Sequence, residues 1–214
     1  MFAALVLHVS LAFPPATPLS PAVRASAVAE AAAIWAPRGV LVGGDQPYSP
    51  VVLTVVTSAH AQAFRAAHAP LAAIVFLPDG TPEPRVVLYL PEVLRLVGCA
   101  RFLGLGERQW PPGLRETIVG RAVGRVLAHE IGHYVMRSRT HTAGGLMRSF
   151  HRADDLVGLS RMPFAAVPID TNLDARSGVS GGETWERTAR RRDAARERKE
   201  RPEPAHAGAG SDRQ

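Results

Sequence analysis

The chain has 214 residues, of which 46% are hydrophobic, so it suits one domain with a sizeable core and excludes a wholly disordered protein. No apolar run approaches the roughly 18 residues that a membrane-spanning helix needs, and the single cysteine, Cys99, excludes an internal disulfide and a cysteine-based zinc finger. The net charge of +6 comes almost wholly from arginine, a bias typical of GC-rich genomes, so it is weak support for an anionic partner.

An apolar stretch, MFAALVLHVSLAF, opens the chain and is followed by PPATP. It resembles the apolar region of a secretory signal ending near Ala16, and this interpretation of residues 1–20 favours an exported protein. The stretch lacks a positively charged start, however, and His8 interrupts it. A buried N-terminal strand, with a cytoplasmic location, is therefore the alternative.

The segment between residues 21 and 98 contains helical and strand-like patterns. Residues 21–35 are rich in alanine and have no interior breaker, so they predict a helix, which Pro37 and Gly39 end. Three short runs rich in β-branched residues then predict strands, and a short helix follows the last of them. The predicted strands are 51–56, 71–77 and 85–90, and the short helix is 91–98.

A long helix is predicted from residue 112 to about residue 137. One face carries apolar residues and two histidines at steps of three and four: Leu114, Ile118, Ala122, Val126, His129 and His133. A second stripe has small residues at four-residue spacing: Gly120, Gly124, Ala128 and Gly132. Because glycine lowers helix propensity by about 1 kcal/mol relative to alanine, we expect close packing against a neighbour to hold this helix. Arg121 and Arg125 are expected on its solvated side.

The motif HEIGH, residues 129–133, lies near the end of this helix and indicates a metal site. Two histidines four residues apart project from one helix face, so His129 and His133 can bind one ion through their imidazoles. Zinc accepts neutral imidazole nitrogens and keeps one position open when three protein ligands bind it. Glu130, beside the first histidine, can take a proton from zinc-bound water, which then attacks a carbonyl group.

A third protein ligand is needed, and the motif supplies two. His141 is the nearest downstream donor, and the linking residues are long enough to end the helix and return to the ion. Asp154 or Asp155 is the alternative, in the segment HRADDL, which also predicts a helix start. His151 in that segment and Cys99 upstream are further candidates. Ligand chemistry and reach favour His141.

The segment HEIGHYVMRSRTHTAGGLM resembles the active-site segment of the metzincin metallopeptidases, whose pattern is HExxHxxGxxH followed by a turn with a methionine. The resemblance implies three zinc ligands, a general base and a turn methionine: His129, His133, His141, Glu130 and Met147. It also implies an α+β, zincin-like fold, with a twisted, mostly parallel sheet of four or five strands, a backing helix and an active-site helix. Two positions differ: Met136 stands at the family's glycine, and His141 lies two residues farther from His133 than in the family.

Residues 21–170 are therefore expected to form a zinc-dependent peptidase domain, whose peptide or protein substrate lies extended along an edge strand, 85–90. A non-catalytic, metal-containing binding module of the same fold is the alternative. Residues 171–214 have many charges and few large apolar side chains, so they predict a disordered tail. Acidic residues interrupt its arginines, and nucleic-acid binding is not expected. The sequence contains no indication of an oligomeric state.

Overall fold

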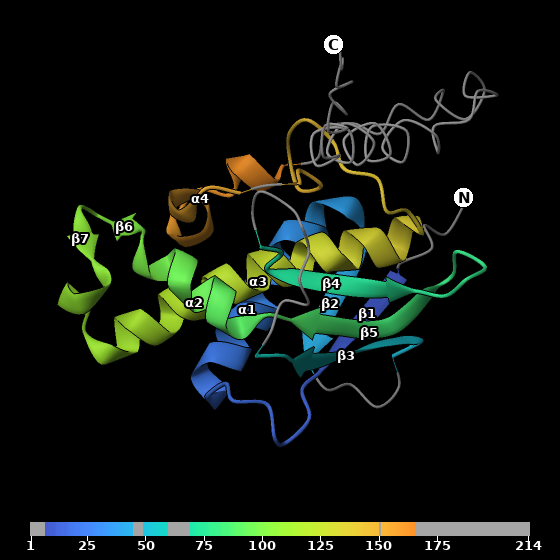
Figure 1. Ribbon diagram of the computed structural model, residues 1–214, viewed down its shortest axis with the longest axis horizontal. Coiled ribbons are helices and arrows are strands. Elements are labelled where there is room, and N and C mark those ends of the chain that lie inside the picture. The colour runs from blue at the N-terminus through green and yellow to red at the C-terminus, as the bar shows by residue number, and fades with distance from the viewer. Residues whose placement is uncertain (1–6, 45–48, 60–68, 150, 166–214) are drawn as a thin grey trace, which may run out of the picture. The chain divides into compact units, whose positions relative to one another are not determined.

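A computed structural model describes residues 7–44, 49–59, 69–149 and 151–165, all of which belong to one unit of the chain, Met1–Val167. The predicted tail, 171–214, lies outside the described residues, as do residues 1–6 of the apolar N-terminal stretch. Within the described part, a single large sheet and a group of helices account for most of the chain (Figure 1).

The sheet has five strands in the order β2-β1-β3-β5-β4. Four of them run parallel, and β4 lies antiparallel to β5 at one edge. This confirms the expected mostly parallel sheet of four or five strands within an α+β fold. The bounds are β1 Leu7–Ala12, β2 Val40–Gly44, β3 Val51–Thr57, β4 Ala72–Phe76 and β5 Pro82–Leu88.

The N-terminal stretch contributes a strand to the interior of the sheet. β1 pairs with β2 on one side and with β3 on the other, and Val9 and Leu11 are buried in the core. This is the strand interpretation of the apolar stretch, and cleavage near Ala16 would remove β1 from the sheet. The two interpretations share one sequence signal because a strand buried on both faces of a parallel sheet also reads as a continuous apolar run.

Helix α1, Pro21–Trp35, connects β1 to β2 and has the bounds expected from the sequence. It starts where Ser20 Oγ accepts a hydrogen bond from the Val23 amide at 3.3 Å, and Pro21 occupies the first helical position. The other helices are α2 Leu90–Gly98, α3 Pro112–Met136 and the short α4 Ala153–Val157. Short 3-10 turns cover Ala36–Arg38, Glu107–Gln109 and Met162–Phe164, and a small hairpin joins β6 Arg101–Phe102 to β7 Leu105–Gly106.

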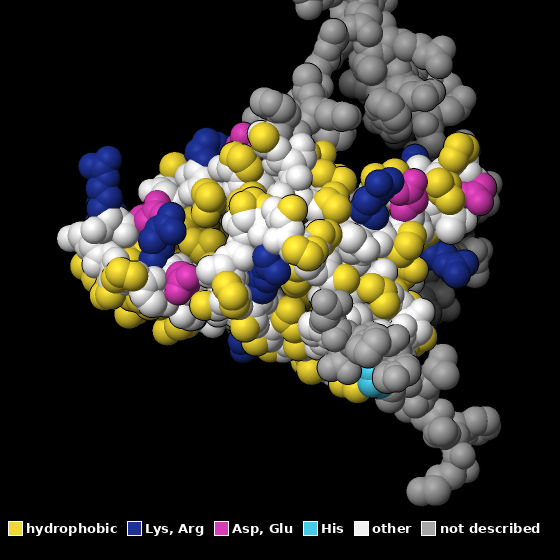
Figure 2. Space-filling view, turned by 90° about the horizontal axis from the view of Figure 1, so that it is seen from below, with side chains coloured by type: hydrophobic (Ala, Val, Ile, Leu, Met, Phe, Trp, Pro, Cys, Tyr) yellow, Lys and Arg dark blue, Asp and Glu magenta, His cyan; other side chains and the backbone are white. Residues whose placement is uncertain are grey.

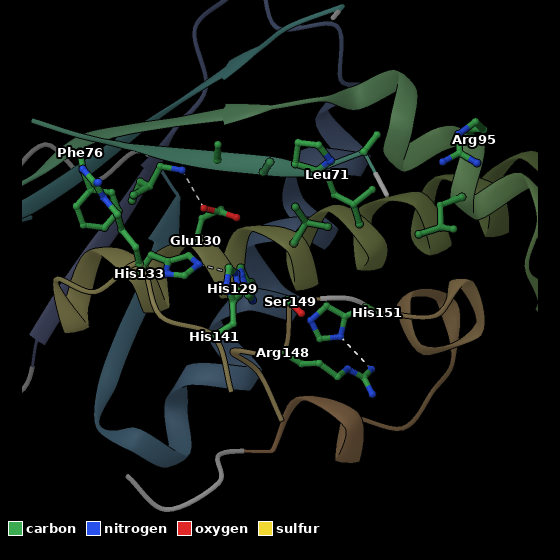
Figure 3. Close-up of a pocket in the computed structure, with 18 residues that line it drawn as sticks. Leu71, Phe76, Arg95, His129, Glu130, His133, His141, Arg148, Ser149 and His151 are labelled. Carbon is green, nitrogen blue, oxygen red and sulfur yellow. Dashed lines mark hydrogen bonds between the residues drawn. The ribbon is translucent and has the colours of Figure 1, made fainter. Parts of the chain in front are cut away.

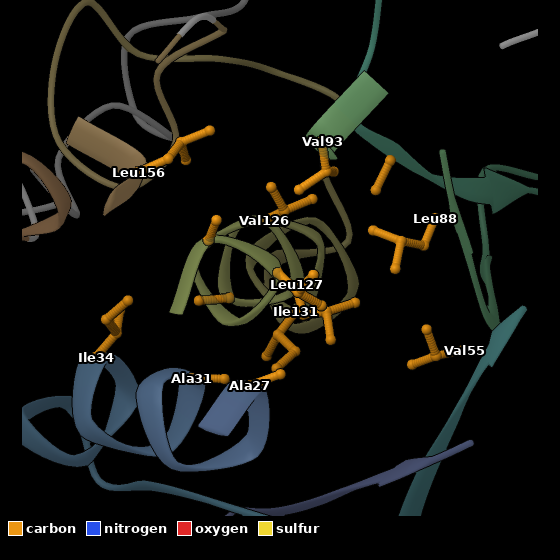
Figure 4. Close-up of a cluster of buried hydrophobic side chains, with 14 of the residues drawn as sticks. Ala27, Ala31, Ile34, Val55, Leu88, Val93, Val126, Leu127, Ile131 and Leu156 are labelled. Carbon is orange, nitrogen blue, oxygen red and sulfur yellow. The ribbon is translucent and has the colours of Figure 1, made fainter. Parts of the chain in front are cut away.

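Helix α3 lies at the centre of the core, where it packs against α1 and against β4 and β5 of the sheet. Figure 4 shows it nearly end-on, with Ala27 and Ala31 of α1 on one side and Val55 and Leu88 of the sheet on another. Leu127 and Ile131 of α3 are fully buried here, along with the rest of its apolar face. A helix apolar over so wide an arc is stabilised by tertiary packing rather than by its own propensity.

The small-residue stripe of α3 lets the two helices approach closely, as expected. A Cβ atom placed on Gly124 would lie 2.5 Å from the Ala27 carbonyl oxygen and 2.8 Å from Glu30 Cβ. At the next small position, the Ala128 carbonyl accepts a hydrogen bond from Trp35 Nε1 at 2.9 Å. The glycines therefore cost helix propensity but allow backbone contact with α1.

We expect Gly124→Ala to destabilise the protein by about 1–3 kcal/mol, the typical cost of forcing an extra carbon into a packed core. The new methyl group would collide with the α1 backbone, which cannot move aside as a flexible side chain does. Gly113→Ala in the same helix is the matched control, because nothing lies within 4 Å of a Cβ there. That change should stabilise the helix by about 0.5–1 kcal/mol. Urea unfolding of both variants measures the two shifts, and equal signs would contradict the packing argument.

The solvated position expected for Arg125 is wrong. Its side chain is 0% exposed, and its Nε donates a 2.8 Å hydrogen bond to Glu30 Oε1 of α1. Arg161 binds the other Glu30 oxygen at 2.7 Å, and the Arg125 guanidinium lies 4.9 Å above the Phe164 ring. Arg121 is partly buried as well, through a 2.7 Å bond to the Val157 carbonyl. Burial of the Arg125 guanidinium is possible because α1, which is far away in the sequence, supplies the Glu30 carboxylate. The periodicity of the α3 sequence does not reveal such a partner.

The outer surface shows no continuous charged region on the face seen in Figure 2, as far as the described residues go. Arginine side chains stand apart there, separated by apolar and uncharged groups. Among the described residues, none of the helices combines the length and the apolar character needed to cross a bilayer.

Candidate metal centre

Three histidines converge beside α3 (Figure 3). His129 and His133 lie one helical turn apart, and His141 reaches them from the loop that follows the helix. One ring nitrogen from each lies within 4.8 Å of the others, and Nε2 of His129 is 3.0 Å from Nε2 of His133. Tetrahedral zinc, with bonds of about 2.0–2.1 Å, needs its ligand nitrogens roughly 3.3 Å apart. The cluster could therefore hold a metal ion after small adjustments.

Backbone carbonyls orient the two helical imidazoles. His129 Nδ1 lies 2.8 Å from the Leu146 carbonyl oxygen, and His133 Nδ1 lies 2.6 Å from that of Ser138. A carbonyl oxygen only accepts, so each Nδ1 must carry a proton and donate it. The lone pair of each Nε2 is then free for a metal, which is the arrangement that favours metal binding by histidine.

The end of α3 explains how His141 reaches the other two histidines. The helix continues to Met136, and Arg137 then adopts a left-handed conformation with φ 48°. The Ser138 amide caps the helix by donating to the His133 carbonyl at 3.2 Å. The turn thus comes after the position at which the metzincin pattern has its glycine. The longer linker carries His141 back to the cluster despite the extra residues.

Met147, which the resemblance implies is the turn methionine, packs on α3 at Gly132. The Thr142 amide donates to the Met147 carbonyl at 2.9 Å, and Gly145 between them adopts φ 72°. The Met147 sulfur fills the space that a Cβ on Gly132 would need, so the turn packs directly against the backbone of α3 at Gly132. The contact between Met147 and Gly132 holds the loop against the helix. The same loop contains Leu146, whose carbonyl orients His129.

Burial keeps the three imidazoles neutral. It lowers the pKa of His129 to about 3, with smaller contributions from the neighbouring histidines. Burial likewise lowers the pKa of His133 and that of His141. Neutral imidazole is the form that binds zinc, so the donor set fits this metal chemically.

Glu130 lies beside the cluster and is held by the edge strand. Its side chain is 5% exposed, and its Oε2 accepts a 2.9 Å hydrogen bond from the Ile74 amide of β4. Burial raises the pKa of this carboxyl to about 7, although the Ile74 hydrogen bond acts in the opposite direction. A carboxyl group poised near neutral pH is suited to accepting and returning a proton.

A cavity of about 650 Å³ opens onto the histidines and Glu130. One wall is the edge strand β4 with the residues before it, and apolar side chains such as Leu71, Leu96 and Val126 line much of the rest. The expected substrate strand, 85–90, is not at an edge, because β5 pairs with β3 and with β4. β4 is the edge strand beside the site, and the β5 assignment is wrong.

The other candidate ligands point elsewhere. Asp155 binds Arg148 at 2.7 Å, and Asp154 Oδ1 accepts from the Arg101 amide at 3.2 Å. Both carboxylates lie in the first turn of α4, where they suit the helix dipole. Cys99 is an exposed free thiol at the end of α2. Of the described residues, the one group of converging donors is that of His129, His133 and His141.

His151 has a place in the site that the sequence does not specify. It lines the cavity without joining the converging donors, and its ring lies 6.0 Å from that of His129. In the sequence, His151 was recognisable only as one of several candidate metal ligands, because it lies in the segment HRADDL. Its actual neighbours, Arg148 and Phe164, come from separate segments that only the fold brings together.

Comparison with family models, with curated proteins and with solved structures yields no match to this chain. The resemblance to metzincins therefore rests on the segment 129–147 itself and on compatibility with the mostly parallel sheet and the three converging histidines.

Proposed function

We propose that this protein is a zinc-dependent peptidase with a zincin-like fold of the metzincin type. The observation that carries the proposal is a single cavity in which three neutral imidazoles converge beside a buried glutamate. The mostly parallel sheet with one antiparallel edge strand, and the packing of Met147 on α3 at Gly132, support it further. This combination suits the attack of water on a carbonyl group better than it suits storage of a metal ion.

Zinc would be held by His129, His133 and His141, and would supply an acidified water and polarisation of the substrate carbonyl. Glu130 accepts a proton from the attacking water and passes it to the leaving amine. The Ile74 amide holds the Glu130 carboxylate on the cavity side of α3, so the base is positioned before substrate arrives. Burial of the carboxyl makes it a stronger base than an exposed glutamate, which matches the task.

The substrate would be a peptide segment in an extended conformation along β4. An edge strand leaves main-chain groups on one side unpaired within the sheet, and these can pair with another extended chain. The Ile74 amide points away from the sheet toward Glu130, so this edge faces the reacting groups. The apolar wall formed by Leu71, Leu96 and Val126 would accept an apolar side chain of the peptide.

Digestion of a broad peptide library by the zinc-loaded protein tests the proposal. We expect reproducible cleavage products that disappear when a chelator removes the metal and return when zinc is restored. A protein that binds zinc and peptides but produces no cleavage at any tested pH would instead be the non-catalytic binding module.

A further inference from the structure

His151 is a buried histidine in the wall of the cavity that the proposed chemistry has not yet used. It is 8% exposed, and its ring stacks on Phe164 with a centroid distance of 4.7 Å and an interplanar angle of 28°. It lines the same cavity as Glu130 and the three converging histidines (Figure 3). The stacking and the burial fix the orientation of the ring relative to the cavity.

The neighbours of His151 determine which of its nitrogens carries the proton. Arg148 Nη2 lies 3.1 Å from His151 Nδ1, and a guanidinium can only donate, so Nδ1 accepts this bond. Asp155 holds the same Arg148 nitrogen at 2.7 Å, which keeps the donor in place. In the neutral ring the proton must then lie on Nε2. A second proton, on Nδ1, would point at the Arg148 guanidinium, so the hydrogen bond to Arg148 favours the neutral ring.

Nε2 of His151 is a buried donor that makes no hydrogen bond of normal geometry among the described residues. The Leu146 carbonyl oxygen interacts with the ring, but it already accepts a hydrogen bond from His129 Nδ1. A buried donor without a good acceptor is destabilising, and folded proteins rarely retain one without a reason. A ligand with an acceptor atom would remove that cost when it enters the cavity.

We propose that the Nε2–H of His151 donates a hydrogen bond to the carbonyl oxygen of the scissile peptide bond as that oxygen becomes negatively charged. This inference rests on the proposed peptidase function and assigns a further catalytic residue to it. The water oxygen forms a bond to the carbonyl carbon, the carbonyl π electrons move onto oxygen, and Glu130 takes the water proton. When the oxygen lone pair reforms the carbonyl, the C–N bond breaks and the proton on Glu130 passes to the nitrogen.

A neutral donor that is already oriented stabilises such an oxygen more than it stabilises the uncharged carbonyl, because the charge develops only during the reaction. Arg148 and Asp155 act through His151 and are positioning residues. They hold the tautomer that places the donor on Nε2, much as an outer partner fixes the tautomer of other functional histidines.

The test compares His151→Phe, which keeps the ring and its stacking on Phe164, with His151→Gln, which restores an N–H donor. In zinc-loaded protein we expect kcat/KM of the Phe variant to fall about 10²–10³-fold, mainly in kcat, and the Gln variant to recover part of the loss. Affinity for a phosphinic peptide, whose oxygens imitate the tetrahedral carbon's, should fall in parallel when measured by calorimetry.

Zinc content and thermal stability of the Phe variant should equal or exceed those of the parent, because the replaced ring loses an unpaired donor. A merely structural histidine would instead lower stability when replaced. If the Phe variant keeps kcat/KM and phosphinic affinity within about threefold of the parent, well below the loss expected for such a donor, the His151 assignment is wrong. That result leaves the peptidase proposal intact as long as Glu130→Gln abolishes cleavage. Failure of the parent itself to cleave overturns both.

Discussion

The variant Glu130→Gln is expected to cleave peptides roughly 10²–10⁴ times more slowly than the parent while retaining zinc. The amide oxygen of glutamine can still accept the 2.9 Å hydrogen bond from the Ile74 amide, so the side chain stays in place. What it loses is the ability to accept a proton from water and return it to the leaving amine. Rates with a fluorogenic peptide taken from the library digest, together with zinc content, measure the effect.

The control for this variant is Glu83→Gln, which removes a carboxylate of β5 that binds the exposed Arg85 at 2.5 Å. This side chain lies outside the cavity, so its rate should match that of the parent. Cleavage by the Glu130 variant at the rate of the Glu83 variant would show that Glu130 is not the base, and the proposed mechanism would fail.

Removal of one imidazole should have the second large effect. We expect His141→Ala to weaken zinc binding by more than about 100-fold, because even groups that merely support metal ligands contribute about 10–100-fold. His141 is exposed overall, and the ring contacts it makes are with His129 and His133 of the cluster, so we expect the metal-free fold to be unchanged. Zinc titration followed by calorimetry measures the affinity of each variant.

Zinc should also stabilise the parent much more than it stabilises the variant. At a zinc concentration about 1,000 times Kd, binding adds about 4 kcal/mol to the free energy of unfolding. For a domain of this size, that corresponds to a rise in Tm of roughly 8–16 °C. With Kd raised about 100-fold, the His141→Ala protein should gain at most about 1.4 kcal/mol at the same zinc concentration, or roughly 3–6 °C in Tm.

Asp154→Asn separates the two candidates for the third ligand. Asp154 is exposed and accepts the Arg101 amide at 3.2 Å, so the variant should bind zinc as the parent does. The reverse outcome, zinc lost with Asp154→Asn and kept with His141→Ala, would overturn the assignment of His141 and leave the helical pair with a carboxylate partner.

Local patterns predicted much of the fold. The bounds of α1 follow from a run of alanines without an interior breaker and from the proline and glycine that end it, and those of α3 follow from apolar periodicity over 25 residues. The short strand Val40–Gly44 escaped prediction, because two of its five residues are glycines and its pairing with β1 is not local. The apolar N-terminal stretch was ambiguous, since a buried parallel strand and a signal segment have the same composition.

Burial of charged groups was less predictable. Arg125 follows Arg121 by four residues on α3, a spacing that resembles a solvated helix face. Its carboxylate partner, Glu30, is 95 residues away on α1, so no local pattern connects the two. The stripe of glycines correctly predicted a close neighbour for α3, but the identity of that neighbour depended on the packing of α1.

The pairing of His129 with His133, and the place of Glu130 beside them, could be known from the sequence because a helical turn determines them locally. The third imidazole, the edge strand beside the cavity and the unpaired donor of His151 required the tertiary structure. Each of these depends on where the chain returns after α3 and on which strand is outermost. Such features arise from contacts between distant segments, and the free energy of packing the whole core selects them.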